Sequence, residues 1–504
     1  MIGGPLTRSI ATDVVAAADT ADSALSGIRQ HESERTITSR SLRLLILVAI
    51  YVVVVFFFPR PANVQPEGWR ITALFLSTIV GFVLQPLSGA VLVILAATLF
   101  VFVGGVPLSK ALAGFSSPSV WLVVAAVLMS RALVESGLSR RIALLFIRRF
   151  GRSSLGISYS LVMTDVVLAS GIPSITARSG GIVLPIARNI ALLYGSAPGA
   201  TARFLGTFLM ACLYQTSAIA CAMFFTGQAS NVLAAGMAVQ FAGVKVTWSS
   251  WFIAGLVPGF ASCIATPYLV YRMLPPVVTR TPEAADFARR ELVAMGSLSR
   301  NERIVLLTFA SVCGLWLTSG WNGLDVTLVA LAGVSVLFLF NVLTWDIALG
   351  EKTAWDMLVW YGGLIMMGEI LNETGVPKAF AASVGSYLGH MPWFFILVAT
   401  LLVYFYVHYV FATITAHVLA MFPVFLVMLV GVGAPPGLAV YSLACLANLT
   451  AGLTHYGTTT APIVFSERYV RLGDWWRVGL AASVLNLTIW LTIGFTWWKL
   501  LGLW

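Results

Sequence analysis

The sequence predicts an all-α polytopic membrane protein with about eleven transmembrane helices and two re-entrant helical hairpins in an inverted repeat. Three observations predict this fold class. Of the 504 residues, 59% are hydrophobic and only 10% are charged. Apolar runs of about 18 or more residues, the length needed to span a bilayer, recur along the chain. Two segments 239 positions apart also repeat the same order of features.

The composition also excludes several classes of protein. In so apolar a chain, the net charge of +10 is expected in membrane-flanking loops. Nucleic acid is therefore not an expected partner. No HExxH motif, nucleophile elbow or carboxylate pair is present, so no catalytic residue, metal or cofactor is expected. The cysteines stand singly and are interpreted as core residues; they are Cys212, Cys221, Cys263, Cys313 and Cys445.

Residues 1–40 differ in composition from the rest of the chain. They are rich in Ala, Ser, Thr and Arg and have no apolar signal-peptide region. We predict a mostly disordered cytoplasmic tail.

The remaining chain divides into predicted spans and two longer stretches. The spans are 41–58, 68–85, 87–103, 117–136, 201–240, 249–271, 302–319, 323–341, 354–373, 436–465 and 478–500. The longer stretches, 153–194 and 392–431, have a polar break near the middle. Each is either a pair of crossing helices or a hairpin that enters and leaves on one side.

The basic residues favour the hairpins. With the N-terminus inside and both stretches re-entrant, 21 of the 30 Lys and Arg residues lie inside, 6 lie outside and 3 lie within membrane segments. This bias is what the positive-inside rule predicts. The C-terminus then lies outside, and the first hairpin enters from inside while the second enters from outside.

Equal spacings support the repeat. Trp121 precedes Ser174 by 53 residues, and Trp360 precedes Thr413 by 53 residues. Inverted-topology repeats are typical of secondary transporters.

The hairpin tips are the first candidate binding elements. Irregular backbone at membrane depth is tolerated where it is buried in protein or lines a cavity. A helix begins after each tip, and its N-terminus attracts anions. Ser174 and Thr176 at one tip, and Thr413 and Thr415 at the other, add hydroxyls. Two such pockets suit a molecule with two carboxylates. In the alternative interpretation these hydroxyls only cap helices.

Arg178 and His417 lie at equivalent positions behind the two tips. An ionisable group inside a membrane segment indicates a functional site. The alternatives are an arginine that reaches the membrane surface and a neutral core histidine. Asp165 is interpreted as structural, paired with a nearby arginine.

Two long spans carry polar interruptions opposite the tips. FFTGQASN (224–231) and LTHYGTTTAP (453–462) are predicted breaks in helices. The predicted ligand contacts there are Thr226, Gly227, Thr454, His455, Gly457 and Thr458.

These motifs resemble those of the divalent anion:sodium symporter (DASS) family. PSITARSGGIVLPI, FATITAHVLAMFPVF and LTHYGTTTAPIVF are closest to the branch of plastid 2-oxoglutarate/malate translocators and bacterial citrate/succinate and tartrate/succinate antiporters. The resemblance covers about residues 41–504. It implies a homodimer, a scaffold domain, an elevator-type transport domain and dicarboxylate binding at both tips.

The sequence departs from the family pattern at one position of each tip. The usual Ser-Asn-Thr-Ala motif has an Asn that helps to bind Na⁺ in sodium-coupled members, and here Ile175 and Ile414 replace it. Arg178 and His417 then act as tethered, charge-compensating cations in place of sodium. If an unpaired cation cannot cross the bilayer without an anionic substrate, the carrier is an obligate exchanger.

The predicted function is therefore Na⁺-independent antiport of di- and tricarboxylates such as succinate, malate, 2-oxoglutarate or citrate. The expected partners are these small molecules, the lipid bilayer and a second copy of the chain, in the bacterial inner membrane. A Na⁺-coupled dicarboxylate symporter is the first alternative, an anion channel the second and a membrane enzyme the third. The predicted division is 1–40 tail, 41–150 and 249–390 scaffold, and 151–248 and 391–504 transport domain.

Overall fold

The computed structural model describes residues 40–61, 64–388 and 391–504, and the chain is helical throughout them. One isolated β-bridge, Ser153 to Arg280, is the only β-pairing in this part of the chain. The predicted tail lies outside the described residues except for Arg40. The all-α prediction is confirmed.

Helices occupy all eleven predicted spans. In the first half these are Arg40–Phe57, α2 (Pro66–Leu84), α3 (Gly89–Phe102), α5 (Pro118–Glu135), α9 (Gly206–Met223) with α10 (Ala229–Ala242), and α11 (Trp248–Met273). In the second half they are α13 (Arg300–Leu317), α15 (Val326–Leu339), α17 (Lys352–Glu373), α21 (Pro436–Leu449) with α22 (Ala461–Ser466), and α23 (Leu472–Ile489) with α24 (Phe495–Leu500). Shorter connecting helices are α4 (Leu108–Ala113), α6 (Leu138–Phe150), α12 (Pro282–Ala294), α14 (Ser319–Asn322), α16 (Trp345–Gly350) and α18 (Val376–Leu388).

Eight helices in the described residues are long and apolar enough to cross a membrane. Two of them, Trp393–Val410 and Ile414–Gly431, are the arms of the predicted second hairpin. Other predicted spans, such as α3 and α15, are apolar but only 14 residues long. The count of eleven spans and the inverted topology stay predictions.

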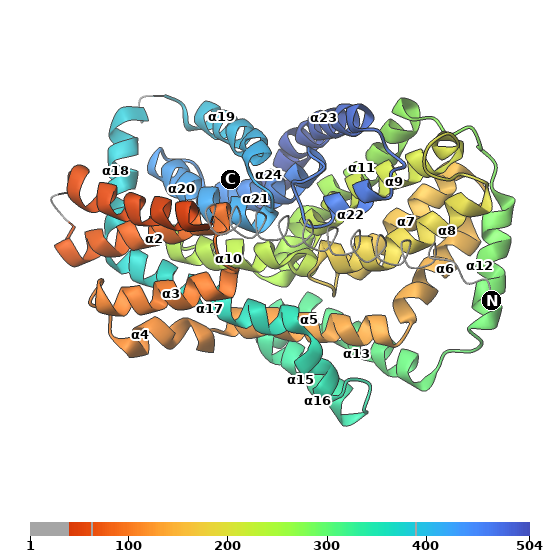
Figure 1. Cartoon of the computed structure of the whole chain (residues 1–504), viewed down its shortest axis with the longest axis horizontal. Coiled ribbons are helices and arrows are strands. Elements are labelled where there is room, and N and C mark those ends of the chain that lie inside the picture. Colours follow the sequence, from red (N-terminus) through yellow and green to blue (C-terminus); the bar gives the residue numbers. More distant parts are fainter. Residues whose placement is uncertain (1–39, 62–63, 389–390) are drawn as a thin grey trace, which may run out of the picture.

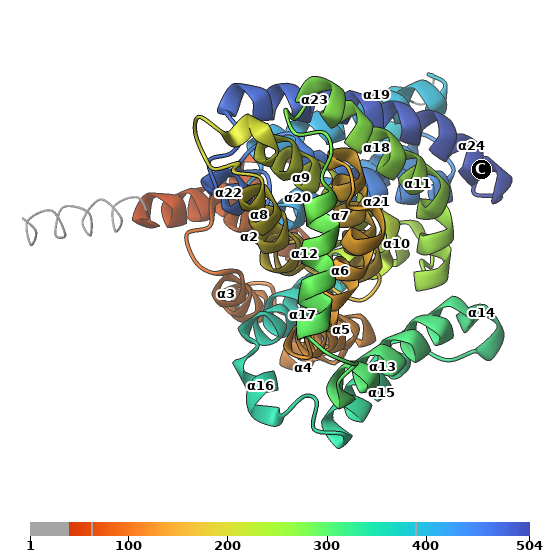
Figure 2. The same cartoon turned by 90° about the vertical axis from the view of Figure 1, so that its right-hand side faces the viewer.

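The helices gather into two groups (Figures 1 and 2). One contains α3, α4, α5, α13, α15, α16 and α17, and lies below the other group in both views. The other contains α7 to α11 and α19 to α24. The expected division into scaffold and transport parts stays a prediction, and the packing of one helix differs from it. The predicted boundary at residue 248 puts α11 in the scaffold, whereas α11 packs on α9, α7 and α23.

Small side chains allow the helices of the second group to pack closely. Every residue of α9 is buried, and its sequence, GTFLMACLYQTSAIACAM, is rich in Gly, Ala, Ser, Thr and Cys. Because lipid is as apolar as a leucine side chain, helices in a membrane associate through close packing at such residues. Helix α9 is therefore the centre around which α7, α11 and α21 pack.

Two short helices mark opposite ends of the molecule. Figure 1 shows α12 at one end and α18 at the other, each running across the direction of most other helices. Each connects the two helix groups. The sequence of α12, PEAADFARRELVA, is charged on one side, as in helices that lie along a membrane surface.

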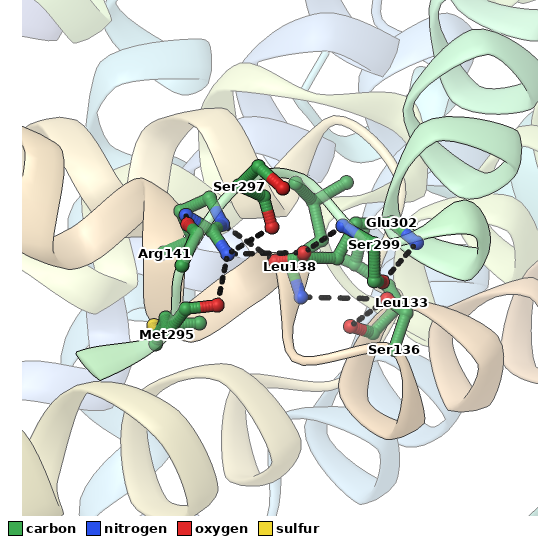
Figure 3. Close-up of polar contacts among 9 residues, drawn as sticks. Leu133, Ser136, Leu138, Arg141, Met295, Ser297, Ser299 and Glu302 are labelled. Atoms are coloured by element: carbon green, nitrogen blue, oxygen red, sulfur yellow. Dashed lines mark hydrogen bonds and ion pairs between the residues drawn. The ribbon is translucent and has the colours of Figure 1, made fainter. Parts of the chain in front are cut away.

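A buried ion pair joins the connection between α5 and α6 to the connection between α12 and α13 (Figure 3). Arg141, in α6, donates from Nε to Glu302 Oε1 over 2.6 Å and from Nη2 to Glu302 Oε2 over 3.1 Å. Its Nη1 donates to the Gly296 carbonyl over 2.9 Å. Glu302 also accepts from the Ser299 amide, which completes the capping box of α13. One guanidinium therefore holds the α5–α6 and α12–α13 connections together.

Arg141→Ala is expected to lower the free energy of unfolding by about 2 kcal/mol, because hydrogen bonds to charged groups contribute roughly 1.5–3 kcal/mol. The measurement is denaturant unfolding of the purified protein in detergent, followed by tryptophan fluorescence. Arg140→Ala is the matched control. Its pair with Glu291 is half exposed, so the loss is expected to stay below about 1 kcal/mol. Equal losses for the two variants would contradict the assignment.

Candidate functional site

The first predicted hairpin consists of two helical arms around a break. Helix α7 (Ser154–Ala169) ends before Gly171 and Pro173, and helix resumes with the π-helical segment η2 (Thr176–Val183), followed by α8 (Leu184–Leu193). Proline disfavours helix at the residue before it and lacks an N–H, so the interruption is fixed locally. The helix–break–helix prediction for 153–194 is confirmed.

The second predicted hairpin has the same construction. Helix α19 (Trp393–Tyr406) tightens into the 3-10 turn η5 (Val407–Val410), and α20 (Ile414–Gly431) begins after a break. Thr413 is the N-cap of α20, and its hydroxyl accepts from the Ala416 amide over 3.1 Å. Both breaks therefore present a helix N-terminus.

Both long spans with polar interruptions are broken, as predicted. The first is interrupted by η4 (Phe225–Gly227) between α9 and α10. The second passes from α21 through η6 (Thr450–Gly452) into irregular backbone before α22. Asn448, on α21, donates to the Asn231 side-chain oxygen of α10 over 2.8 Å, which joins the two broken helices behind the tips.

A cavity of about 1140 Å³ lies where the tips and breaks meet. The tips and breaks supply Pro173, Ser174, Ile175, Thr176, Ala177, Gln228, Ala229, Thr413, Ile414, Thr415, Thr458 and Thr459. The opposite wall consists of Arg40, Phe82, Gln85, Pro86, Leu87, Ser88, Gly89, Val91, Thr353, Asp356, Met357 and Trp360. The cavity therefore lies between the tips and breaks on one side and the first helix, α2, α3 and α17 on the other, and it is large enough for a C4–C6 carboxylate.

Two predicted hydroxyls of the cavity, those of Ser174 and Thr413, cap helices and still have a proton to donate. Ser174 accepts from the Ala177 amide over 3.3 Å, and Thr458 accepts from the Ala461 amide over 3.0 Å. Capping uses a lone pair of the oxygen and leaves the O–H group. Capping therefore accounts for one bond each of Ser174 and Thr413, and it is compatible with donation to an anion in the cavity. Thr458 instead donates to the Tyr214 hydroxyl, whose own hydrogen goes to the Ala451 carbonyl.

Thr176 joins the first tip to the second broken helix. Its hydroxyl lies 2.7 Å from the Thr459 hydroxyl and 3.0 Å from the Thr460 hydroxyl. These contacts link residues 283 and 284 positions apart in the chain. The two halves of the chain therefore meet at the cavity wall.

Several predicted contact residues lie outside this lining. Thr226 is buried, donates to the Ser170 carbonyl over 2.6 Å and accepts from the Trp248 indole over 3.0 Å. Thr454 is fully buried behind the break, and Gly457 approaches His408. His455 accepts from the Trp476 indole over 3.4 Å beside Phe465. The structure thus places Thr226, Gly227, Thr454, His455 and Gly457 around the cavity without making them part of its wall.

Arg178 lies behind the first tip, fully buried. Its Nε donates to Asp165 Oδ1 over 3.0 Å, and Nη1 donates to the carbonyls of Ile172 (2.5 Å) and Gly227 (2.6 Å). Nη2 contacts the sulfur of Cys221 over 3.1 Å. The side chain therefore ties the first tip to the first broken helix.

This geometry corrects the prediction that Arg178 is an unpaired cation and agrees with the prediction that Asp165 pairs with an arginine. Arg178 is not an unpaired cation, because Asp165 supplies a negative charge inside the same domain. The expected pairing of Asp165 with an arginine is confirmed, and the alternative in which Arg178 reaches the membrane surface is wrong. The obligate-exchange argument cannot rest on a free guanidinium.

His417 lies behind the second tip, also fully buried. Its Nδ1 is 3.3 Å from Nδ1 of His408, and the Tyr404 ring lies 4.3 Å away between centroids. His408 Nε2 in turn lies 2.9 Å from the Gly457 carbonyl. The second tip is thus tied to the second break through two imidazoles.

Sequence reasoning missed three residues of this site. Gln228 accepts from the Ile175 amide through Oε1 over 3.4 Å, Thr459 lines the cavity and His408 connects His417 to Gly457. Gln228 and Thr459 stand inside motifs that the sequence analysis quoted, so their polarity within apolar segments was an available signal. His408 was visible only as a second histidine near position 417.

Together, broken helices, paired helix N-termini and a polar cavity beside them define a polytopic membrane transporter. The sequence matches the family described as "Sodium:sulfate symporter transmembrane region" over residues 38–504. The chain therefore belongs to this family, the divalent anion:sodium symporters, and is an integral membrane transporter rather than an enzyme.

Individual relatives agree with this placement. The chain is 40% identical over 462 residues to YflS of Bacillus subtilis, covering 92% of this chain and 96% of that protein. It is 39% identical over 467 residues to "Dicarboxylate transporter 1, chloroplastic" of Spinacia oleracea, covering 92% and 82%. It is 32% identical over 476 residues to "Inner membrane protein YbhI" of Escherichia coli, covering 92% and 99%.

Two solved structures share the fold. MtrF of Neisseria gonorrhoeae aligns with a TM-score of 0.55 at 14% identity, over 91% of this chain and 94% of that chain. The YdaH transporter of Alcanivorax borkumensis aligns with a TM-score of 0.50 at 14% identity, over 75% and 85%. At such identity the likeness concerns the fold alone.

Proposed function

We propose that this protein exchanges di- and tricarboxylates across the bacterial inner membrane without Na⁺, by an elevator-type movement of the group that contains both tips. The observation that carries this proposal is the position of Arg178. Its guanidinium binds the carbonyls of Ile172 and Gly227, and carbonyl oxygens are typical ligands of hard metal cations. A side chain that cannot dissociate thus occupies carbonyl ligands that would otherwise be available to a mobile cation, while Asp165 balances its charge.

The substrate class follows from the cavity. Two helix N-termini, at Thr176 and Ile414, each carry a partial charge of about +0.5. The hydroxyls of Ser174, Thr176, Thr413 and Thr415 line the cavity between them. A molecule with two carboxylates on a short carbon chain suits two helix N-termini that line one cavity. The chloroplast relative named as a dicarboxylate transporter supports the same class.

Obligate exchange follows from desolvation of the empty site. In transit, the helix ends and hydroxyls leave bulk water, and unpaired polar groups in an apolar environment cost several kcal/mol. A bound dianion satisfies these donors, so the loaded domain crosses more readily than the empty one. The Arg178–Asp165 pair carries no net charge. Arg178 therefore holds the first tip against the first broken helix, and the donors of the cavity make the movement of the domain depend on a bound substrate.

The remaining features of the proposal concern topology and assembly. The N-terminus is assigned to the cytoplasm and the C-terminus to the outside, because 21 basic residues then lie inside and 6 outside. Helices α12 and α18 then lie along opposite membrane surfaces. A homodimer is part of the proposal, and light scattering of the detergent-solubilised protein measures its mass.

A flux experiment in proteoliposomes tests the coupling. Labelled succinate outside is expected to enter vesicles loaded with malate at rates that agree within about twofold in sodium and choline buffers. Entry into vesicles without internal dicarboxylate is expected to remain at the level of protein-free liposomes. Uptake into empty vesicles driven by a Na⁺ gradient would establish the symporter alternative, and flux without counterflow would establish the channel alternative.

A further inference from the structure

The second tip contains a pair of histidines whose hydrogen bonds leave one proton position open. His408 (η5) and His417 (α20) are both fully buried, and their Nδ1 atoms are 3.3 Å apart. Thr413 and Thr415, just before His417 in the chain, line the cavity, as does Thr458, just after Gly457. The pair therefore lies directly behind the proposed substrate site.

The tautomers of the pair follow from the acceptor at one end. The Gly457 carbonyl can only accept a hydrogen bond, so the His408 Nε2 atom, 2.9 Å away, carries a hydrogen. A neutral His408 then has a bare Nδ1, which accepts from Nδ1–H of His417. A neutral His417 is consequently bare at Nε2, and this atom is buried without a hydrogen-bond partner. An additional proton binds there without breaking the existing bonds.

Few other groups influence this pair. Among the described residues, His408 is the side chain that acts on His417 through its charge, and α19 contributes the Tyr404 ring and the main chain of Tyr404 beside the imidazole. The hydroxyl of Tyr404 is itself without a partner. No ion pair of the described residues includes either imidazole. A protonated pair therefore lacks a counter-ion in the described part of the chain, in contrast to Arg178.

The close approach of Gly457 connects the pair to the cavity wall. A Cβ at this position would lie 2.9 Å from His408 Nε2 and 2.7 Å from Thr454 Oγ1. The absence of a side chain at Gly457 is thus what allows His408 to reach the main chain one residue before Thr458. A charge on the pair acts on the cavity across a short, protein-filled path in which screening is weak.

We propose that the His408–His417 pair is a proton-binding site that takes up one proton as a dicarboxylate dianion enters the cavity. This inference rests on the proposed function for the identity of the ligand. The dianion supplies a counter-charge that the residues described around the pair do not supply, so proton and substrate stabilise each other's binding. The proton crosses with the substrate, and exchange of two carboxylates of different charge is accompanied by net proton movement.

Succinate binding to the full-length protein in detergent tests this site. Calorimetric titrations between pH 7.0 and 8.5, in buffers of different ionisation enthalpy, measure proton uptake while both succinate carboxyl groups are ionised. The expected result is uptake of up to about one proton per chain and a Kd that rises by up to about tenfold per pH unit. His417→Asn is expected to bind succinate with less than about 0.2 proton and a flat pH dependence.

Two further variants keep the test decisive. Tyr404→Phe removes the neighbouring titratable hydroxyl and keeps the ring, so its proton uptake is expected to equal that of the wild type. His408→Gln is expected to bind succinate without proton uptake, and it replaces His417→Asn in the test if that variant does not fold. Succinate binding without proton uptake by the wild-type protein would overturn the proton site and leave the exchange function intact. Failure of any carboxylate to bind would overturn both proposals.

Discussion

Asp165→Ala is expected to destabilise the protein by about 3–5 kcal/mol, the largest stability effect predicted here. The variant leaves the Arg178 guanidinium, fully buried in the structure, without its carboxylate partner, and an uncompensated buried charge costs several kcal/mol. We expect a shift of the unfolding midpoint in detergent and little monodisperse protein by size-exclusion chromatography.

Two matched variants separate the ion pair from general sensitivity to the loss of an acid. Glu67→Ala removes an acid whose pair with Arg70 is exposed, so the cost is expected to stay below about 1 kcal/mol. The double variant Asp165→Leu, Arg178→Met replaces both charges with apolar groups of similar size. It is expected to recover most of the stability, because buried ion pairs are commonly replaceable in this way.

The double variant also tests the functional assignment of Arg178. It removes the donors that bind the carbonyls of Ile172 and Gly227. We therefore expect a folded protein in which exchange is impaired. A single Asp165→Ala variant as stable as the wild type would show that the pair does not carry the electrostatic role assigned to it.

The second large effect is expected on transport. Thr176→Val is predicted to lower the kcat/KM of succinate–malate exchange by about 10- to 100-fold, because hydrogen bonds to charged groups contribute roughly 1.5–3 kcal/mol. The substitution keeps the shape of the side chain and removes the hydroxyl that contacts Thr459 and Thr460. Counterflow in proteoliposomes measures the loss.

Thr176→Ser and Thr98→Val are the controls for this prediction. Serine preserves the hydroxyl and is expected to retain most of the activity. Thr98 donates to the Ile94 carbonyl of its own helix, α3, and does not line the cavity, so its replacement by valine is expected to leave exchange unchanged. A Thr176→Val protein that exchanges at the wild-type rate would remove this hydroxyl from the site.

The helices and their interruptions were predictable from the sequence. Pro173, next to Gly171, ends the first arm because of backbone chemistry that acts within a few residues. The predicted breaks in 201–240 and 436–465 likewise lie at the polar motifs. Apolar periodicity and turn chemistry are local properties, so a single sequence contains them.

The position of α11 was predicted less well. Its length and composition indicate a membrane span, which the helix Trp248–Met273 supports, but they do not indicate the helices that it packs against. Because helices in a membrane are apolar on every side, their sequence carries little information about which face meets which neighbour. The sequence analysis therefore placed α11 in the scaffold, whereas it packs with α9 and α23.

By itself the sequence determined the helical class, the breaks and the small set of polar residues available to a site. Only the tertiary structure decided that Arg178 binds the Gly227 carbonyl, that Thr176 meets Thr459, and that His408 connects His417 to Gly457. The physical reason is the distance along the chain. A break depends on neighbouring residues, whereas a partner 49 or 283 positions away is fixed by how the helices pack.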